Sequence, residues 1–446
     1  MGYVMKKELY MRTLFVCFSF ALLFTLNVPA DENWPQWRGP NFSGYVEASG
    51  LPTSWSETEN IVWKTPLPSW SGSTPIIWGD KIFIMTPSRG EEGGHGSDAD
   101  RPSVGAQVLL LCLDKKDGHV LWERGLDTGN ENINKQNDSS PSPVTDGDHV
   151  WAMTGTGLLA AFTMDGDPLW RFDIQENYGA FGLQFGYGSS PLLYEDMVIV
   201  QVLHGYNTDD PSYLVAFDGV SGEVRWKVER PTDAVYESPD AYTTPLPVTH
   251  DDRTDIVISG GDYVTGHDPA TGVERWRAAG LNPEKSRLYR IIASSVSCCG
   301  MIFSPTRQKP LLALRAGGSG EITTSHLVWK WEERYGPDVP TPACDGAYLY
   351  FADDRGMALC LEPTTGKVLW GPERTARGVV SASPLVADGK IYITNEDAVT
   401  TVLAAGSAYK ELAVNKLDRS YTLSSIAVSG SRLYLRTATH LYCIGE

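Results

Sequence analysis

Residues 112–122 read Cys-Leu-Asp-Lys-Lys-Asp-Gly-His-Val-Leu-Trp, and the repetition of this stretch decides the fold. The frame is an apolar pair, an acidic residue, a glycine four positions later and a tryptophan four positions after that. It returns at Asp218-Gly222-Trp226, Asp268-Gly272-Trp276 and Glu362-Gly366-Trp370. A shortened version runs from Ala161 to Trp170 and a lengthened one from Leu314 to Trp331. The tryptophans recur at intervals of roughly 40–55 residues, which is the period of a propeller blade.

A second phrase stands upstream of each copy. It contains Ser or Thr, usually Pro, a short apolar stretch, an Asp/Gly turn, and then alternating aromatic and β-branched residues. Residues 142–151, Ser-Pro-Val-Thr-Asp-Gly-Asp-His-Val-Trp, are one example. A hairpin turn followed by period-two alternation predicts an antiparallel meander. Eight phrases predict eight blades, and they begin near Thr74, Ser142, Ser190, Thr244, Ser295, Thr341, Ser383 and Ser425.

The eighth blade is expected to take its strands from both ends of the chain. No tryptophan follows Cys443, whereas residues 60–67, Asn-Ile-Val-Trp-Lys-Thr-Pro-Leu, have the outer-strand pattern without its preceding strands. Pairing the two ends leaves no open edge between the first and last blades. We therefore predict an all-β, eight-bladed β-propeller of four-stranded antiparallel blades over residues 60–446. An N-terminal arm over residues 31–59 precedes it, and we expect Trp34, Trp37 and Arg38 to latch this arm onto the disc.

Residues 1–30 have the pattern of a secretory signal peptide. Lys6, Lys7 and Arg12 precede an apolar run from Leu14 to Val28, and a small-residue site follows at Ala30. The alternative is a retained anchor helix, but the run is shorter than the roughly 20 residues that a bilayer span needs. We expect cleavage near Ala30 and a periplasmic or extracellular location. No later segment is apolar enough to span a membrane.

Charge and cysteine usage narrow the function classes. The formal net charge is −18, and removing residues 1–30 would take away three basic residues and one acidic residue, leaving −20. Such an acidic surface repels nucleic acid, so nucleic-acid partners are not expected. Six cysteines would remain, of which Cys112, Cys360 and Cys443 occupy one repeat position facing a blade core. Buried free thiols are therefore favoured over a disulfide framework, and the spacing matches no zinc pattern.

The repeats resemble the quinoprotein-like propeller family, whose members include the outer-membrane assembly lipoprotein of the BAM complex and the PQQ-dependent alcohol dehydrogenases. Residues 34–41 (Trp-Pro-Gln-Trp-Arg-Gly-Pro-Asn), 181–191 and 440–445 also look like a group of exported propeller proteins typical of Planctomycetes. The resemblance covers the chain from about Trp34 to Glu446. It implies the propeller fold, and in the dehydrogenase branch it also implies PQQ held with calcium.

Adjacent cysteines, Cys298 and Cys299, raise the question of that cofactor. In the alcohol dehydrogenases a vicinal disulfide covers one face of PQQ, but those enzymes carry the pair in an early blade, whereas here it stands where other blades have an Asp-Gly turn. A cofactor-stacking ring, a structural or redox-sensitive ring, and plain turn cysteines all remain open. No hydrolase elbow, phosphate loop or His-Glu-x-x-His motif appears, so we predict no catalytic residue and no metal site.

Loops before the blade-start phrases are expected to open onto one end of the central channel. Aromatic and amide side chains gather there, and such groups stack on sugars, bind an extended peptide or hold a quinone. The alternative is that they only pack the top of the propeller. The candidate ligand-surface residues are Trp70, Asn134, Lys135, Gln136, Asn137, Phe181, Phe185, Tyr187, Tyr236, Glu237 and Tyr242.

Together these features favour an exported, non-catalytic and monomeric propeller that binds a cell-envelope protein, peptide or glycan. The alternative from another class is a PQQ-dependent alcohol or sugar dehydrogenase. A third hypothesis, an assembly factor that captures nascent strands by edge pairing, is weakened because bulky Phe15 and Val16 precede Cys17, so no lipidation signal is present.

Overall fold

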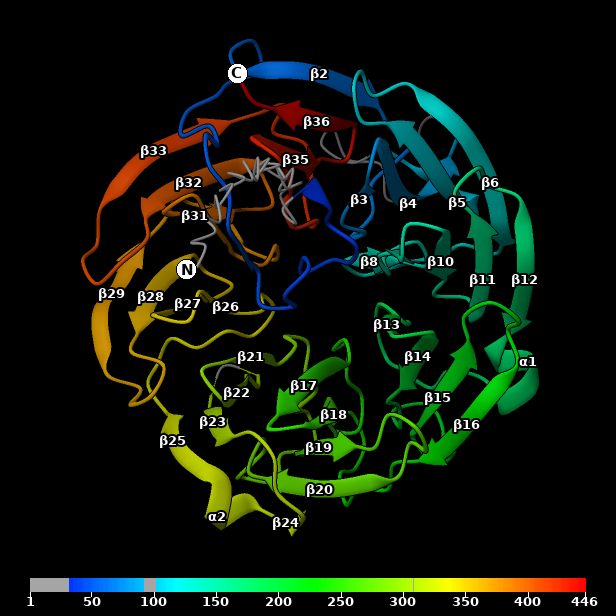
Figure 1. The fold of residues 1–446 in the computed structure, drawn as a ribbon, viewed down its shortest axis with the longest axis vertical. Coiled ribbons are helices and arrows are strands. Elements are labelled where there is room, and N and C mark those ends of the chain that lie inside the picture. Colours follow the sequence, from blue (N-terminus) through cyan, green and yellow to red (C-terminus); the bar gives the residue numbers. More distant parts are fainter. Residues whose placement is uncertain (1–31, 92–101, 308) are drawn as a thin grey trace, which may run out of the picture. The chain divides into compact units, whose positions relative to one another are not determined.

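Eight antiparallel sheets are arranged around a central axis, one for each predicted blade (Figure 1). The computed structural model describes residues 32–91, 102–307 and 309–446. The predicted signal peptide, residues 1–30, lies outside the described residues. No helix in the described part of the chain is both long enough and apolar enough to cross a membrane. The prediction of an all-β, eight-bladed propeller is confirmed.

Blades 1 to 4 each take four strands in chain order, from the channel outward. Blade 1 contains β3 (Ile76–Trp78), β4 (Lys81–Arg89), β5 (Val104–Asp114) and β6 (Val120–Thr128). Blade 2 contains β9 (Val144–Thr145), β10 (His149–Met153), β11 (Leu158–Thr163) and β12 (Pro168–Asp173). Blade 3 contains β13 (Leu192–Tyr194), β14 (Met197–Val202), β15 (Tyr213–Asp218) and β16 (Val224–Glu229). Blade 4 contains β17 (Leu246–His250), β18 (Arg253–Gly260), β19 (Tyr263–His267) and β20 (Glu274–Ala279).

Blades 5 to 7 follow the same order, and blade 8 is completed by a strand from the other end of the chain. Blade 5 contains β21 (Val296–Cys298), β22 (Met301–Ser304), β23 (Leu311–Arg315) and β25 (Leu327–Trp331). Blade 6 contains β26 (Ala343–Cys344), β27 (Leu349–Ala352), β28 (Met357–Leu361) and β29 (Val368–Arg374). Blade 7 contains β30 (Leu385–Ala387), β31 (Lys390–Thr394), β32 (Val399–Ala404) and β33 (Glu411–Lys416). Blade 8 contains β34 (Ala427–Ser429), β35 (Arg432–Arg436), β36 (His440–Ile444) and β2 (Ile61–Pro66).

Short additional elements lie on this frame. In the arm, β1 (Tyr45–Val46) pairs in parallel with β30, and β24 (Gly320–Glu321) pairs in parallel with the outer strand β20. A small hairpin, β7 (Asn132–Ile133) and β8 (Gln136–Asn137), precedes blade 2. The described part of the chain also has two short helices, α1 (Ile174–Tyr178) and α2 (Thr323–His326).

The repeated tryptophan joins neighbouring blades. In six blades its indole Nε1 donates to a main-chain carbonyl of the next blade at 2.8–3.1 Å. Its ring also covers the turn glycine of that blade, so that a Cβ on Gly222 would lie 2.5 Å from the Trp170 ring. Opposite each tryptophan the partner strand carries a small residue, which leaves room for the indole. The three cysteines predicted to face blade cores hold this position, and all three are buried free thiols: Cys112 opposite Trp122, Cys360 opposite Trp370 and Cys443 opposite Trp63.

In the lengthened fifth copy the repeat tryptophan is Trp329, not the predicted Trp331. Trp329 pairs with Ala313 and donates to Pro363 of blade 6, as the other seam tryptophans do. Trp331 lies two residues further along the same strand and donates to the Tyr335 carbonyl. Trp329 and Trp331 lie on the same face of β25 because they are two residues apart. The insertion of β24 and α2 removes the regular spacing between turn glycine and tryptophan, so the sequence did not show which of the two is the repeat tryptophan.

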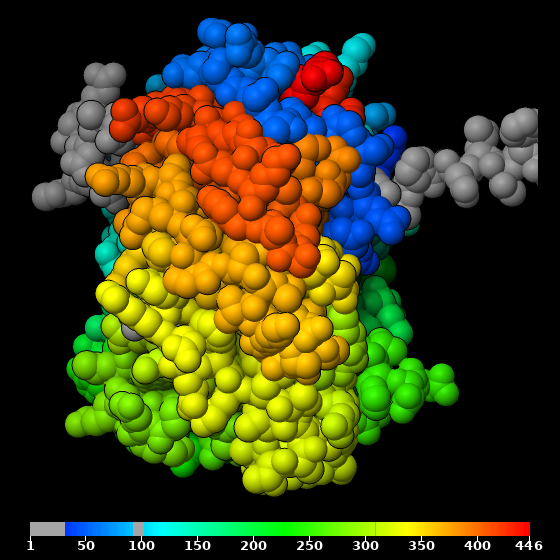
Figure 2. All heavy atoms as spheres, turned by 90° about the vertical axis from the view of Figure 1, so that its left-hand side faces the viewer, coloured from blue at the N-terminus to red at the C-terminus, as the bar shows by residue number. Residues whose placement is uncertain are grey.

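Closure of the ring follows the prediction. Strand β2 pairs antiparallel with β36, and Trp63 lies opposite Cys443. The Gly445 amide also donates to the Asn60 carbonyl at 3.0 Å. Figure 2 shows the blue segment that contains β2 lying against the red C-terminal segment. Blade 8 therefore has four strands, and no edge is left open between blades 8 and 1.

Candidate functional site

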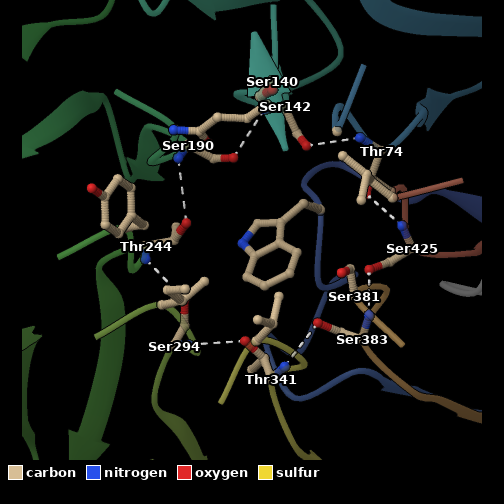
Figure 3. A pocket seen from close by; sticks show the side chains of 18 residues that line it. Thr74, Ser140, Ser142, Ser190, Thr244, Ser294, Thr341, Ser381, Ser383 and Ser425 are labelled. Atoms are coloured by element: carbon tan, nitrogen blue, oxygen red, sulfur yellow. Dashed lines mark hydrogen bonds between the residues drawn. The ribbon is translucent and has the colours of Figure 1, made fainter. Parts of the chain in front are cut away.

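Eight hydroxyl groups form a closed ring of hydrogen bonds around the channel (Figure 3). In each blade the backbone N–H at the start of the innermost strand donates to the Ser or Thr hydroxyl of the next blade, at 2.9–3.4 Å. The last bond, from Ser425 to Thr74, joins blade 8 to blade 1. The ring residues are Thr74, Ser142, Ser190, Thr244, Ser294, Thr341, Ser383 and Ser425.

Seven of the eight predicted blade starts are members of this ring, and the fifth prediction was one residue off. Ser294, not Ser295, accepts from Thr244. The Ser295 hydroxyl instead shares a hydrogen bond with Ser304 of the neighbouring strand at 2.7 Å. Successive side chains of an extended segment point in opposite directions, so only one of two adjacent serines can face the next blade.

Residues two positions before each ring member line the channel just beyond the ring. They are small in blades 1 to 3 and again in blade 7, and large elsewhere, which makes one side of the channel apolar. This second ring contains Gly72, Ser140, Gly188, Tyr242, Ile292, Val339, Ser381 and Leu423, and it encloses a volume of about 150 Å³ together with the hydroxyl ring.

The N-terminal arm crosses one end of the channel. The Pro35 carbonyl accepts from Thr145 of blade 2, and the Ser43 carbonyl accepts from Cys344 of blade 6. Both amides follow their ring serine or threonine in the chain, so the arm lies on the side toward which the innermost strands run. Trp37 lines the channel from this arm.

Arg38 holds the arm in place. Its guanidinium is 4% exposed and donates to the carbonyls of Pro342 at 2.7 Å and Pro384 at 3.0 Å, in blades 6 and 7. Burial lowers its pKa to about 9. Trp34 exchanges two backbone hydrogen bonds with Ile77 of blade 1. The expected latch of Trp34, Trp37 and Arg38 therefore spans the disc from blade 1 to blade 7.

A larger pocket of about 350 Å³ lies at the opposite end, which we call the mouth pocket. Most of its lining residues stand in the loops before ring members, while Asp354 lies in the β27–β28 turn. It shares Gln136 and five second-ring residues with the channel. It is lined by Ile133, Asn134, Lys135, Gln136, Phe185, Tyr242, Arg290, Ile292, Asp338, Val339, Asp354, Ser381 and Leu423.

The β7–β8 hairpin covers one side of the mouth pocket. Gln136 donates to the Phe185 and Gly186 carbonyls of the next loop, and a side chain at Gly188 would lie 2.3 Å from Gln136 Oε1. At the hairpin tip the Lys135 ammonium lies 2.7 Å from the Glu396 carboxylate of blade 7. The small second-ring residue of blade 3, Gly188, therefore makes room for a hairpin whose tip pairs with blade 7.

Two charged residues that line the mouth pocket, Arg290 and Asp338, are incompletely paired. The Arg290 guanidinium lies over the Phe185 ring at 5.1 Å, and its Nη1 lies 3.3 Å from Glu237 Oε1. Arg290 Nε and Asp338 Oδ1 are buried and have no hydrogen-bond partner among the described residues. Burial raises the pKa of the Asp338 carboxyl, while Arg290 and Lys135 act in the opposite direction. Such unsatisfied buried atoms are rare in native proteins and call for an explanation.

The structure brings some of the predicted surface residues together and separates others. Asn134, Lys135, Gln136, Phe185 and Tyr242 line the mouth pocket, and Glu237 supports it through Arg290. The remaining candidates lie elsewhere. Trp70 and Asn137 are buried and bonded to each other, Tyr187 is buried against the half-buried Phe181, and Tyr236 is exposed beside Tyr206 at 4.8 Å between ring centroids.

Sequence reasoning missed the opposite half of the pocket. Arg290, Asp338, Val339 and Leu423 stand in loops with no cluster of aromatics, so their composition carried no signal. A positional signal did exist, because every second-ring residue stands two positions before a ring serine or threonine, and alternate residues of an extended strand face the same side.

The cysteine pair of blade 5 is not a vicinal ring. Cys298 is disulfide-bonded to Cys344 of blade 6, with 6.4 Å between their Cα atoms, and Cys299 is free and exposed. The expectation of free thiols, in place of disulfides, was therefore wrong for Cys298 and Cys344. The two lie in neighbouring blades at adjacent innermost strands, a proximity that spacing along the chain did not reveal.

Comparison with known proteins supports the architecture. A family model described as "Outer membrane protein assembly factor BamB" matches residues 106–297 and 313–442, which is more than half of the chain. No curated protein matches this chain in sequence.

Solved structures share the fold at low sequence identity. BamB from Moraxella catarrhalis is 14% identical with a TM-score of 0.59, covering 86% of this chain and 99% of its own. A quinohemoprotein alcohol dehydrogenase from Comamonas testosteroni is 11% identical with a TM-score of 0.63, covering 92% and 80%. A europium-containing methanol dehydrogenase is 11% identical with a TM-score of 0.64, covering 93% and 98%. Identities this low show the common fold alone.

Proposed function

Because this chain belongs to the family of the outer membrane protein assembly factor BamB, we propose that it is a non-catalytic propeller that binds a polypeptide segment at the mouth of its channel. The observation that carries the proposal is the mouth pocket itself. It combines two buried atoms that have no hydrogen-bond partner among the described residues, Arg290 Nε and Asp338 Oδ1, with an apolar rim formed by Tyr242, Ile292, Val339 and Leu423. The family name refers to a factor that acts on other proteins, which agrees with a polypeptide partner.

The chemistry of a peptide matches this pocket. Tyr242, Ile292, Val339 and Leu423 offer an apolar surface for one large side chain. Arg290 supplies a donor and Asp338 an acceptor, and every peptide unit carries both a carbonyl acceptor and an N–H donor. Lys135 pairs with Glu396 and Arg290 with Glu237, but Arg290 Nε has no partner among the described residues. This N–H can donate to a neighbouring acidic side chain, and charge-assisted hydrogen bonds are the stronger ones. A segment with an apolar residue beside an acidic one fits these groups best.

We further propose that the protein acts outside the cytoplasm, after cleavage near Ala30. The support is the charged, then apolar, then small-residue pattern of residues 1–30. A cell-envelope or exported protein is then the partner class. The intact mass of the protein recovered from the periplasm or medium tests this: a chain beginning at Asp31 supports export, and an uncleaved chain in the cytoplasm contradicts it.

Fluorescence anisotropy with short labelled peptides, each carrying a large apolar side chain beside an acidic one, tests the binding function. The variant Val339→Glu places a carboxylate in the apolar rim, and Val328→Glu is the matched control because Val328 is 42% exposed on the outer strand β25. We expect wild type and control to bind alike and V339E to bind at least tenfold more weakly, a loss of about 1.4 kcal/mol.

Equal affinities of V339E and V328E would place binding elsewhere and overturn the proposal, as would no peptide binding at all. Binding of a neutral oligosaccharide by a protein that binds none of the peptides would point to a glycan site instead. Equilibrium unfolding of both variants shows whether their folds are comparably stable.

The dehydrogenase alternative does not fit the residues present. The Cys298–Cys299 pair lies at the β21–β22 turn on the arm side, at the opposite end of the channel from the mouth pocket, so it does not cover a quinone held in that pocket. The two carboxylates of the mouth pocket, Asp338 and Asp354, share it with the cations Lys135 and Arg290. Titration with PQQ and calcium remains decisive: specific binding, seen as a bound-quinone absorbance and a higher melting temperature, would replace the peptide proposal with an oxidoreductase.

A further inference from the structure

A free thiol lies beside the disulfide that joins blades 5 and 6. Cys299 Sγ is 3.7 Å from Cys298 Sγ, and the three sulfur atoms of Cys298, Cys299 and Cys344 all lie within 4.8 Å of one another. Cys299 is exposed, whereas Cys344 is buried. Disulfides exchange when a thiolate reaches one of their sulfur atoms, so this arrangement supplies both the bond and its attacking group.

The backbone places the thiol there. Cys299 and Gly300 form the two-residue turn between β21 and β22, with φ of 56° and 69°. Blade 7 has Asp388 and Gly389 at the same place, with φ of 51° and 65°. Such turns favour Asn, Asp or Gly at the first position because other side chains are strained at positive φ. The turn itself therefore does not require a cysteine, and its geometry holds the Cys299 side chain toward blade 6, where Sγ donates to the Gly346 carbonyl at 2.8 Å.

We propose that Cys298, Cys299 and Cys344 form a thiol–disulfide exchange site in which one disulfide is shared among three sulfur atoms. The Cys299 thiolate attacks Cys298 Sγ and forms a Cys298–Cys299 bond. The Cys298–Cys344 bond breaks, and Cys344 leaves as a thiolate that takes up the proton lost by Cys299. The number of disulfides and of thiols is unchanged, so the step needs no external oxidant or reductant.

Exchange would remove the covalent crosslink between blades 5 and 6 on the arm side of the propeller. The Cys298–Cys344 bond crosslinks blades 5 and 6, and the Cys344 amide donates to the Ser43 carbonyl of the arm. The Cys298–Cys299 bond lies within one turn and leaves that seam without a crosslink. It also moves the free thiol from the exposed Cys299 to the buried Cys344. The site therefore differs in reactivity between its two states.

Burial and the nearby Asp345 raise the pKa of the Cys299 thiol. The thiolate is the attacking species, so the exchange rate should increase as the pH rises. Cys112, Cys360 and Cys443 are buried in blade cores and remain inert.

Peptide mass spectrometry of the full mature protein tests the proposal. Thiols are trapped by alkylation in acid, either directly or after incubation at alkaline pH without oxidant. We expect the directly trapped protein to contain Cys298–Cys344 with alkylated Cys299. After incubation, a second population should contain Cys298–Cys299 with alkylated Cys344. The variant Cys299→Ser should show the first pairing alone under both conditions.

A second variant tests whether the new pairing is sterically accessible. In Cys344→Ser, equilibrated with glutathione disulfide as the oxidant, we expect a Cys298–Cys299 disulfide and no alkylation of either residue. The proposal is overturned if wild type shows only Cys298–Cys344 after alkaline incubation, or if C344S keeps two alkylatable thiols or only mixed disulfides with glutathione.

Discussion

At the scale of single residues, one hydroxyl per blade joins the whole channel wall. Ser294 is a suitable test because its Oγ is the acceptor for the Thr244 amide at 2.9 Å. Ser294→Ala leaves that amide without its partner, and we expect a loss of about 1–2 kcal/mol in the free energy of unfolding. Ser294→Thr retains the acceptor and already has precedent in the ring at Thr74, Thr244 and Thr341. Urea unfolding of both variants measures the difference, and equal losses would show that the hydroxyl is dispensable.

The sequence predicted the channel and core residues well where one residue type recurs at the same position of each repeat. The repeated serines and threonines and the buried cysteines are visible as positions in a repeat. It failed where two adjacent residues satisfy the same rule, as with Ser294 and Ser295. It also failed where a contact joins distant loops, as in the Cys298–Cys344 bond and the Lys135–Glu396 pair.

At the scale of strands and turns, the seams depend on tryptophan covering glycine. Gly222 has φ of 73° and a Cβ there would lie 2.5 Å from the Trp170 ring, whereas Gly389 has φ of 65° and open space around it. Gly389→Ala therefore carries only the backbone strain, about 1 kcal/mol. Gly222→Ala must also displace the indole, and we expect at least about 1 kcal/mol more. Denaturant titration of the pair checks this, and the idea fails if the two alanines destabilise equally.

The strands of the repeated blades are predictable for a physical reason. Each blade needs alternating buried and exposed side chains, the same turns between strands and the same packing against the next blade. Insertions have no such constraint. The parallel strand β24 and the arm strand β1 each pair once, with strands that the folded propeller brings near, and the hairpin of β7 and β8 occurs before blade 2 alone. The mouth pocket is built from the β7–β8 hairpin and from loops between strands, and eight of its thirteen lining residues were not foreseen.

At the scale of the whole molecule, the N-terminal arm connects blades on opposite sides of the channel. Among the described residues Arg38 has no carboxylate partner, and it donates to carbonyls of blades 6 and 7. Arg38→Ala leaves buried carbonyls unsatisfied, and we expect a loss of about 3 kcal/mol, with faster chymotrypsin cleavage at Phe42. Arg38→Lys keeps the charge with fewer donors and should be intermediate. Unchanged cleavage in R38A would show that other contacts hold the arm.

The pairing of β2 with β36 has a consequence for chain order. The Asn60 carbonyl and the Gly445 amide are hydrogen-bonded, so the two ends of the propeller meet inside one sheet. The hydroxyl ring likewise has no first or last member. A circular permutant, joined at that sheet and opened in an exposed turn such as that at Gly389, would preserve every blade and every bond of the ring. The blade at which the chain begins is therefore not fixed by the contacts between blades, whereas the order of the blades around the axis is.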